Sequence, residues 1–171
     1  MDNNLTEFER EMLGLLEAHV EAEMQGDLDL TMSTMVDNPH LLNIPNMMGG
    51  DSFEGVKTFY KDHLVGKFFP PDVKFHRISL TVGRTQIVDE LVITFTHTKM
   101  VEHLLPNIEP TNKVLKIPLV VIAGIKNKKL THEHIYWDQA SVLVQLGLLE
   151  PKGLPVVGKQ SADKLLALIN D

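Results

Sequence analysis

The chain has 171 residues, the length of one domain, and 43% of them are hydrophobic, which is enough to fill a sizeable core. It has no cysteine, which excludes a disulfide framework and thiolate chemistry and is typical of a cytoplasmic protein. The formal net charge of −7 argues against nucleic acid as a partner, and the longest apolar run, Ile117 to Ile125, is too short to span a bilayer. We therefore expect one soluble domain over residues 1–171, with a core at 1–150 and a C-terminal extension at 151–171.

The chain opens with a predicted helix. Apolar residues from Leu5 to Val20 recur at helical spacing, and Thr6 with Glu9 three residues later has the pattern of a capping box. Gly26 and Asp27 are predicted to end this helix, and Asp27 is placed to cap the next one. The Asn38-Pro39 pair should stop that second helix. The following segments are predicted as helix, strand, turn and helix at residues 27–35, 40–45, 49–50 and 52–67.

After the Pro70-Pro71 break the residues become typical of β-structure. Four strands rich in Val, Ile, Thr and Phe are predicted at residues 73–82, 86–98, 113–125 and 130–138. A short helical turn and an amphipathic helix follow at residues 141–148 and 161–169. Helices followed by antiparallel strands indicate an α+β fold, with a curved antiparallel sheet and N-terminal helices closing a cone-shaped pocket.

The stretch HEHIYWDQ, residues 132–139, concentrates groups that can do chemistry. Strand alternation puts residues 130, 132, 134, 136 and 138 on one face and residues 131, 133, 135 and 137 on the other. If the first face is the inner one, two imidazoles, a phenol and a carboxylate line the pocket, a set suited to acid–base work. If the second face is the inner one, His132 and His134 are solvated. A β-bulge would shift this parity.

Other interpretations of the same residues stay open. Asp138 can cap the segment that begins at Gln139, and Tyr136 and Trp137 can serve packing alone. The His-x-His pair could bind a metal ion together with Asp138 or His97, although this spacing is generic.

His97 lies deep in the strand-like segment ITFTHTKM. A buried histidine needs a partner, so His97 is a core residue bonded to the backbone, a residue on the solvent face, or a base or hydrogen-bond donor in the pocket. Serine hydrolase, nucleotide-binding and zinc protease motifs are missing from the sequence. Four further residues could approach the pocket mouth: His40, Asn43, Tyr60 and His63.

Two stretches resemble the SnoaL-like polyketide cyclase family, within the nuclear transport factor 2-like superfamily. FTHTKMVEHLLPNIEPTNKVLKIP, residues 95–118, is similar to a family stretch in which Thr-His-Thr on a strand precedes Pro-Thr and the next strand. HEHIYWDQASVLVQLGLL, residues 132–149, resembles the last strand, where an Asp precedes the Gly of Gln-Leu-Gly, here Asp138 and Gly147. The likeness covers roughly Leu5 to Leu149.

The resemblance implies a cystatin-like roll, a homodimer through the sheet face and chemistry without a cofactor. In the cyclases an Asp at the position of Asp138 is the general acid–base, and a His matching His97 lies near it. The sequence departs from the family where a Glu and a Trp often precede that Asp, at the positions of His132 and His134.

We therefore expect a cofactor-free acid–base enzyme, a cyclase, isomerase, dehydratase or lactone-type hydrolase, that acts on a small apolar carbonyl-bearing or cyclic molecule. Asp138 and His97 are the predicted catalytic residues, and Asp138→Asn should abolish turnover but keep the fold. The alternative is a ligand-binding or dimeric assembly module of the same fold without catalysis. The predicted ligand-binding residues are His134, Tyr136, Trp137, His132, Tyr60, Asn43, His40 and His63, and no metal site is predicted.

Overall fold

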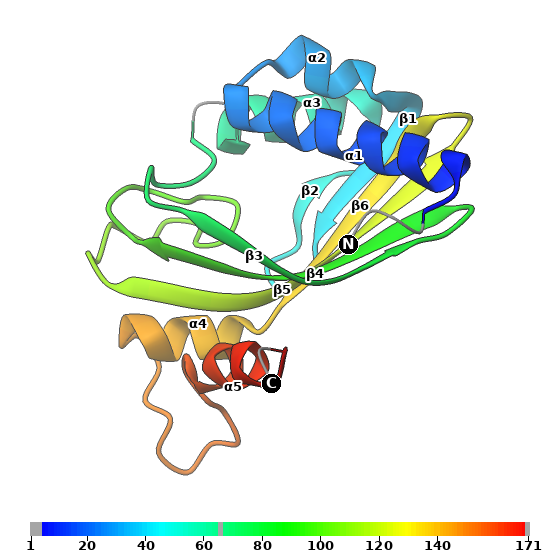
Figure 1. Ribbon diagram of the computed structural model, residues 1–171. Helices are drawn as coiled ribbons and strands as arrows, with labels where there is room; N and C mark the ends of the chain where they lie inside the picture. Colours follow the sequence, from blue (N-terminus) through cyan, green and yellow to red (C-terminus); the bar gives the residue numbers. More distant parts are fainter. Residues whose placement is uncertain (1–4, 65–66, 170–171) are drawn as a thin grey trace.

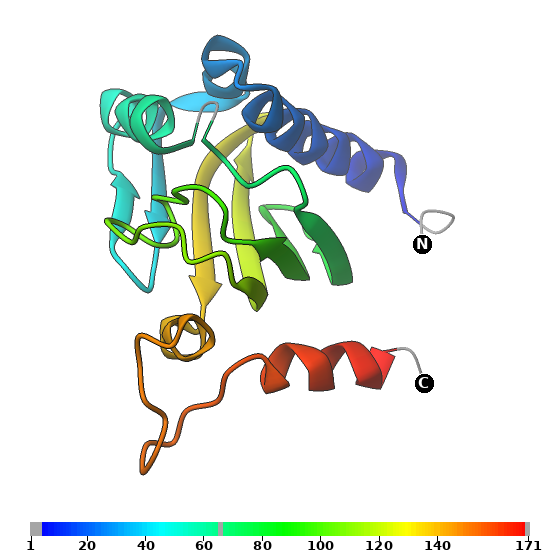
Figure 2. The same ribbon diagram turned by 90° about the vertical axis from the view of Figure 1, so that its left-hand side faces the viewer.

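The computed structural model describes residues 5–64 and 67–169 and consists of a curved six-stranded sheet with helices on both sides. Helices α1, α2 and α3 cover one face, and α4 and α5 lie on the other (Figures 1 and 2). The sheet does not close, and its strand order is β2-β1-β6-β5-β4-β3. The strands are β1 (Met35–Asn43), β2 (Met48–Gly50), β3 (Lys74–Val82), β4 (Gln86–Thr96), β5 (Val114–Lys126) and β6 (Lys129–Trp137).

The first helix, α1 (Glu7–Gln25), has the predicted capping box. The Thr6 hydroxyl accepts from the Glu9 backbone N–H at 3.2 Å, and the Glu9 carboxylate accepts from the Thr6 N–H at 2.7 Å. Gly26 ends the helix with φ of 75°, the left-handed conformation that glycine adopts without strain. Asp27 caps α2 (Leu28–Ser33), as predicted.

The second helix ends earlier than the sequence indicated. It stops at Ser33, and Pro39, expected to break it, lies within β1. Pro39 is tolerated there because the pairing between β1 and β6 is interrupted between Met35 and His40, so no ladder hydrogen bond needs its missing N–H.

The predicted turn at Gly49-Gly50 is instead strand β2, which pairs with β1. A Cβ on Gly50 would lie 2.3 Å from the backbone of Gly55 and Val56, so β2 and α3 (Phe53–Phe59) approach backbone to backbone. The predicted helix at 52–67 is α3 followed by a π-helical turn, η2 (Tyr60–Leu64). Positions 65 and 66 of that prediction lie outside the described residues.

The sheet is mixed, not purely antiparallel. Neighbouring strands from β3 to β6 are antiparallel as predicted, but β1 runs parallel to β6. Strands from the two ends of the core therefore lie side by side. Their register places Leu41 next to Glu133 and His40 next to His132.

A one-residue irregularity in β6 decides which side chains point inward. The pairing with β5 jumps from Ile125–Leu130 to Gly124–His132, which leaves Thr131 as an extra residue. Leu130 is fully buried under the helices, and after the bulge the inward positions become Glu133 and Ile135. The bulge thus moves every following side chain to the face opposite that of a regular strand.

Two apolar clusters fill the molecule. One lies beneath the N-terminal helices and includes Met12, Leu16, Val56 and Leu130. The other lies towards α4 and contains twelve buried residues, among them Leu104, Phe95, Leu115, Trp137 and Val142.

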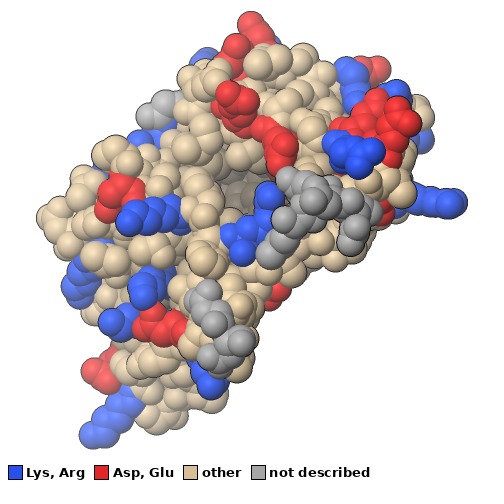
Figure 3. Space-filling view, viewed as in Figure 1, with Lys and Arg blue, Asp and Glu red and all other residues tan. Residues whose placement is uncertain are grey.

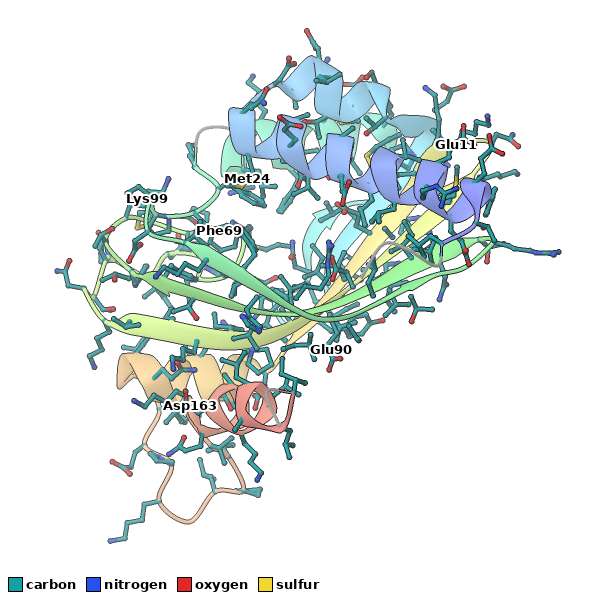
Figure 4. All side chains as sticks on the ribbon, in the orientation of Figure 1. Glu11, Met24, Phe69, Glu90, Lys99 and Asp163 are labelled. Atoms are coloured by element: carbon teal, nitrogen blue, oxygen red, sulfur yellow. The ribbon has the colours of Figure 1, made fainter. Side chains whose placement is uncertain are left out.

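Helices α4 (Gln139–Leu146) and α5 (Gln160–Ile169) pack on the outer side of β5. Asp163, labelled in Figure 4, accepts from Lys116 of β5 at 2.6 Å and ties α5 to the sheet. Among the described residues, none of the helices has the length and apolar character needed to cross a membrane.

Candidate functional site

A cavity of about 510 Å³ lies between α1 and the inner face of the sheet. Its opening is visible in Figure 3 as a hollow below the acidic side chains of α1. Both apolar clusters contribute to its walls, which are largely hydrophobic. Strand residues that form the floor include Leu41, Leu91, Ile93, Leu119, Val121 and Ile135. A cavity of this size and character is suited to a small apolar molecule.

Four polar side chains are buried together at one wall of the cavity. His19 and Glu23 come from consecutive turns of α1, Tyr60 from η2 and Glu133 from β6. The Tyr60 hydroxyl donates to Glu133 Oε2 at 3.0 Å and lies 3.0 Å from His19 Nε2. His19 Nε2 also lies 3.3 Å from Glu23 Oε1 and 3.5 Å from Glu133 Oε2. We call these four residues the inner cluster.

Within the inner cluster, only the two glutamates line the cavity. Glu23 and Glu133 are 5% and 4% exposed, whereas His19 and Tyr60 are fully buried behind them. A molecule in the cavity would therefore meet two carboxyl groups held from behind by an imidazole and a phenol.

The imidazole of His19 is fixed by a chain of hydrogen bonds. The Thr34 hydroxyl donates to the Thr31 carbonyl at 2.6 Å, so its oxygen is free to accept from His19 Nδ1, also at 2.6 Å. With Nδ1 engaged, Nε2 faces the carboxyl groups of Glu23 and Glu133.

The electrostatics of the inner cluster give its groups different protonation states. Burial opposes the charged form of His19, but the carboxylates of Glu23 and Glu133 outweigh it and raise the pKa of His19 to about 10. Burial also opposes the charge of Glu133, yet the His19 cation and the hydrogen bonds from His19 and Tyr60 leave the pKa of Glu133 below its usual value.

Glu23 and Tyr60 shift in the other direction. Burial raises the pKa of Glu23, with the His19 cation opposing this effect and Glu133 adding to it. Burial and the two neighbouring carboxylates raise the pKa of Tyr60 well above its ordinary value, so the phenol keeps its proton and donates to Glu133. The cluster thus places an ionised carboxylate beside a carboxyl group that holds its proton more readily, an arrangement suited to acid–base catalysis.

Three members of the inner cluster, His19, Glu23 and Glu133, are the one group among the described residues whose ligand atoms could hold a metal ion. One ligand atom each of His19, Glu23 and Glu133 lies within 4.8 Å of the others. An imidazole and two carboxylates suit several divalent metals. A metal ion would have to displace the proton of His19, which already balances the charge of Glu133.

The two predicted catalytic residues lie away from the cavity lining. Asp138 is exposed and caps α4, where its carboxylate accepts from the Ser141 N–H at 3.1 Å and from the Ser141 hydroxyl at 2.6 Å. His97 is fully buried, and its Nδ1 accepts from the Thr111 N–H at 3.3 Å. Its Nε2 has no hydrogen-bond partner among residues 5–64 and 67–169. Their catalytic role stays a prediction, which mutagenesis compares below with the inner cluster.

Three histidines predicted to bind ligand gather on the outer face of the sheet. His40 Nε2 lies 2.9 Å from His134 Nε2, and the His132 ring stacks on both, with centroids 4.8 and 4.5 Å away. The expectation that His132, His134 and Tyr136 face inward is corrected by the bulge at Thr131, which turns Glu133 and Ile135 inward instead. Tyr136 is 41% exposed.

The remaining predicted residues lie in the cavity wall, in the core and in a separate surface pocket. Asn43 lines the cavity, and Tyr60 belongs to the inner cluster. Trp137 packs in the second apolar cluster, with its Nε1 donating to Gln139 at 2.6 Å. His63 lines a separate surface pocket beside β2 and α3.

Sequence reasoning missed His19 and Glu23 as site residues, although a signal for them was present. Both lie on the buried stripe of α1 that includes Met12 and Leu16. A histidine and a glutamate four residues apart on an otherwise apolar helix face need a buried polar partner, and that requirement marks a candidate site. The sequence left open which face of β6 is the inner one, so Glu133 was not singled out as a site residue.

No protein-family model matches the chain, and no curated protein matches it. Solved structures do match. A candidate SnoaL-like polyketide cyclase from Jannaschia sp. CCS1 is 12% identical, with 86% of this chain and 99% of that one covered at a TM-score of 0.66. AclR, a candidate hydroxylase from Streptomyces galilaeus, is 19% identical, with 82% and 98% covered at a TM-score of 0.60.

A third similar structure is a protein with a ketosteroid isomerase-like fold from Catenulispora acidiphila, determined in complex with trimethylamine. It is 12% identical, with 79% of this chain and 93% of that one covered at a TM-score of 0.59. At these identities the likeness is one of fold. The chain has the α+β cone fold of the SnoaL-like and nuclear transport factor 2-like proteins, as the sequence resemblance indicated.

Proposed function

We propose that this protein is a cofactor-free acid–base enzyme that moves a proton on a small apolar molecule held in the cavity. The observation that carries the proposal is the pair of carboxyl groups, Glu133 and Glu23, which line an apolar cavity and whose pKa values are shifted in opposite directions. Two neighbouring carboxyl groups, of which Glu133 gives up its proton more readily and Glu23 less readily, can supply the base and the acid that proton transfer needs.

In this proposal Glu133 removes a proton from a carbon next to a carbonyl group. The electrons of the broken C–H bond form a C=C bond, and those of the carbonyl move onto its oxygen, which the Glu23 carboxyl group stabilises by donating a hydrogen bond or its proton. Returning the proton at another carbon completes an isomerisation, and attack of the new carbon nucleophile on a second carbonyl completes a cyclisation. His19 and Tyr60 position Glu133 and touch no substrate.

The apolar walls support this assignment. They exclude water, so the charges of the inner cluster act at low effective dielectric. Candidate polyketide cyclases share the fold, which supports reactions of this class without deciding among cyclase, isomerase, dehydratase and hydrolase. A non-catalytic pocket or assembly module of the same fold is the alternative.

A base-catalysed probe reaction tests the proposal without knowledge of the substrate. Nitrobenzisoxazole loses one proton to a base and opens its N–O bond to give a coloured cyanophenolate. We expect the protein to accelerate this reaction, and Glu133→Gln to lower the rate by about a hundred-fold or more, because general-base catalysis contributes factors of that order.

The matched control is Asp138→Asn. Asparagine caps helices as well as aspartate, so this variant should keep both stability and rate. A rate lost in Asp138→Asn and kept in Glu133→Gln would overturn the proposal in favour of the Asp138 prediction. A rate equal to that of buffer, with apolar ligands still bound, would favour the non-catalytic alternative.

A further inference from the structure

The charged groups around the cavity are almost all acidic. Arg77 is the single Lys or Arg among the described residues that line it. Its guanidinium makes a bidentate pair with Asp89, at 2.9 and 2.8 Å, so its charge is matched locally. His103 adds no positive charge, because burial lowers its pKa to about 3. The carboxyl groups in the lining are those of Glu17, Glu21, Glu23, Asp89 and Glu133.

Two of these carboxylates lie at the mouth. Glu17 and Glu21 occupy consecutive turns of α1 with Val20 between them, and all three side chains are exposed. Within residues 5–64 and 67–169, neither glutamate forms an ion pair with a Lys, Arg or His side chain. Glu21 accepts a hydrogen bond from the neutral side chain of Gln25 at 2.9 Å. The hollow in Figure 3 opens beneath this acidic side of α1.

Aromatic rings extend from the mouth into the cavity. Phe75 on β3 is 47% exposed, and its ring lies 5.7 Å from that of Phe69, which in turn lies 4.7 Å from Phe68. All three line the cavity, and Phe69, labelled in Figure 4, comes from the segment that leads into β3. Aromatic faces beside carboxylates attract organic cations through both the ring quadrupole and the opposite charge.

We infer that the ligand of the cavity is an apolar amine, whose ammonium group lies at the mouth between Glu17, Glu21 and Phe75. Its apolar body extends between the phenylalanines towards Glu133. Anionic molecules of the same shape would enter a cavity lined by carboxylates and be repelled. The inference rests on the proposed function only in identifying which end of the ligand reacts, since recognition at the mouth needs no catalysis.

A series of ligands that share one ring system tests the charge preference directly. Naphthylmethylamine, naphthylmethanol and naphthoate carry a cation, a neutral group and an anion on the same aromatic body, and their fluorescence reports binding. We expect the amine to bind about ten-fold more tightly than the alcohol, and naphthoate to bind most weakly. Added salt should reduce the preference, because it screens exposed charges.

Variants locate the ammonium group. Glu17→Gln with Glu21→Gln should remove the preference for the amine and leave binding of the alcohol unchanged. The control is Glu7→Gln with Glu11→Gln, which makes the same change of charge on α1 away from the cavity lining; Glu11 is labelled in Figure 4. This control should keep the preference.

Two outcomes would overturn the inference. Equal binding of amine and alcohol by the unmodified protein would overturn it. A preference that survives in the Glu17 and Glu21 double variant but disappears in Glu133→Gln would place the ammonium at the inner cluster and also overturn it. The proposed function is tested separately from this inference, because its test uses the neutral probe nitrobenzisoxazole.

Discussion

Individual side chains show where the sequence could and could not locate the site. Asn43 and Tyr60 were selected from the sequence because of their position near the predicted pocket, and both lie at or next to the cavity. Alternation sorted the residues of β6 into two faces without deciding which is the inner one, and the extra residue at Thr131 puts Leu130 and Glu133 on the inner face and His132 and His134 on the outer one. A one-residue change in register moves every following side chain to the other face of the sheet. The face on which a side chain lies therefore depends on how its strand pairs with the neighbouring strand.

The burial of a single residue, His103, predicts how the stability of the protein changes in acid. Burial lowers the pKa of His103 from its ordinary value of 6.5 to about 3, so between these pH values the unfolded chain binds a proton at His103 and the folded protein does not. The stability that this group contributes is therefore present above pH 6.5 and is lost as the pH falls towards 3. Phenylalanine at this position keeps the stacking on Phe68 and removes the titration.

The measurement is the free energy of unfolding in denaturant for the unmodified protein and for His103→Phe, at several pH values below 6.5. The stability of the unmodified protein should fall more steeply, by about 1.4 kcal/mol per pH unit relative to the variant. Parallel curves would mean that His103 is protonated in the folded protein. His76, exposed on β3, provides a control in His76→Phe.

The secondary-structure elements were predicted well where local signals decide them. The capping box at Thr6, the Asp27 cap and the β-branched strands all act within a few residues. Gly49 and Gly50 were misread as a turn because two glycines in sequence are typical of turns. Here they allow β2 to lie against β1 and α3, a requirement that arises only from the packing of distant segments.

The close approach of β2 to α3 predicts a sharp difference between two glycine substitutions. Gly50→Ala would place a Cβ 2.3 Å from the backbone of Gly55 and Val56, which cannot rotate away. We expect a loss of unfolding free energy on the order of 3 kcal/mol, typical of overpacking against rigid neighbours. Gly14→Ala, in α1 with nothing within 4 Å, should instead stabilise by about 1 kcal/mol through helix propensity.

Thermal or denaturant unfolding of both variants checks this prediction. Similar stability of Gly50→Ala and the unmodified protein would show that β2 moves away from α3 without cost. A circular dichroism spectrum that still has native helix and strand content would separate a local strain from loss of the fold.

For the whole molecule, the α+β class, the helices closing the cone and the resemblance at the level of fold all agree with the structure and its neighbours. The parallel pairing of β1 with β6 was outside the reach of sequence reasoning, because it joins segments from opposite ends of the core. The inner cluster depends on this pairing, since β6 contributes Glu133 beside β1 and beneath α1.

The family resemblance also predicts a homodimer through the sheet face, and the face of the sheet opposite the cavity is the one that is free to form it. That face carries His40, His132 and His134 in mutual contact. Burial and the neighbouring imidazoles lower the pKa of His132 and of His134, so these two rings take up protons only in acid. We expect light scattering to give a dimer mass near neutral pH and a shift towards the monomer in acid, where His132 and His134 take up protons.

Replacing His40 and His134 by glutamine should remove that pH dependence, while His76→Gln at the far edge of the sheet should preserve it. A monomer mass at every pH would contradict the predicted dimer. A dimer that is indifferent to pH would place the contact elsewhere on the molecule.

Because β1 and β6 are neighbours in the sheet but far apart in the sequence, the sheet can be completed only late in the synthesis of the chain. Glu133 is translated 73 residues after Tyr60, its hydrogen-bonding partner. Until then His19, Glu23 and Tyr60 lack the carboxyl group that completes their cluster, and the sheet lacks the strand between β1 and β5. The step that completes the sheet is therefore the same step that assembles the inner cluster, because β6 supplies both the strand between β1 and β5 and the carboxyl group of Glu133.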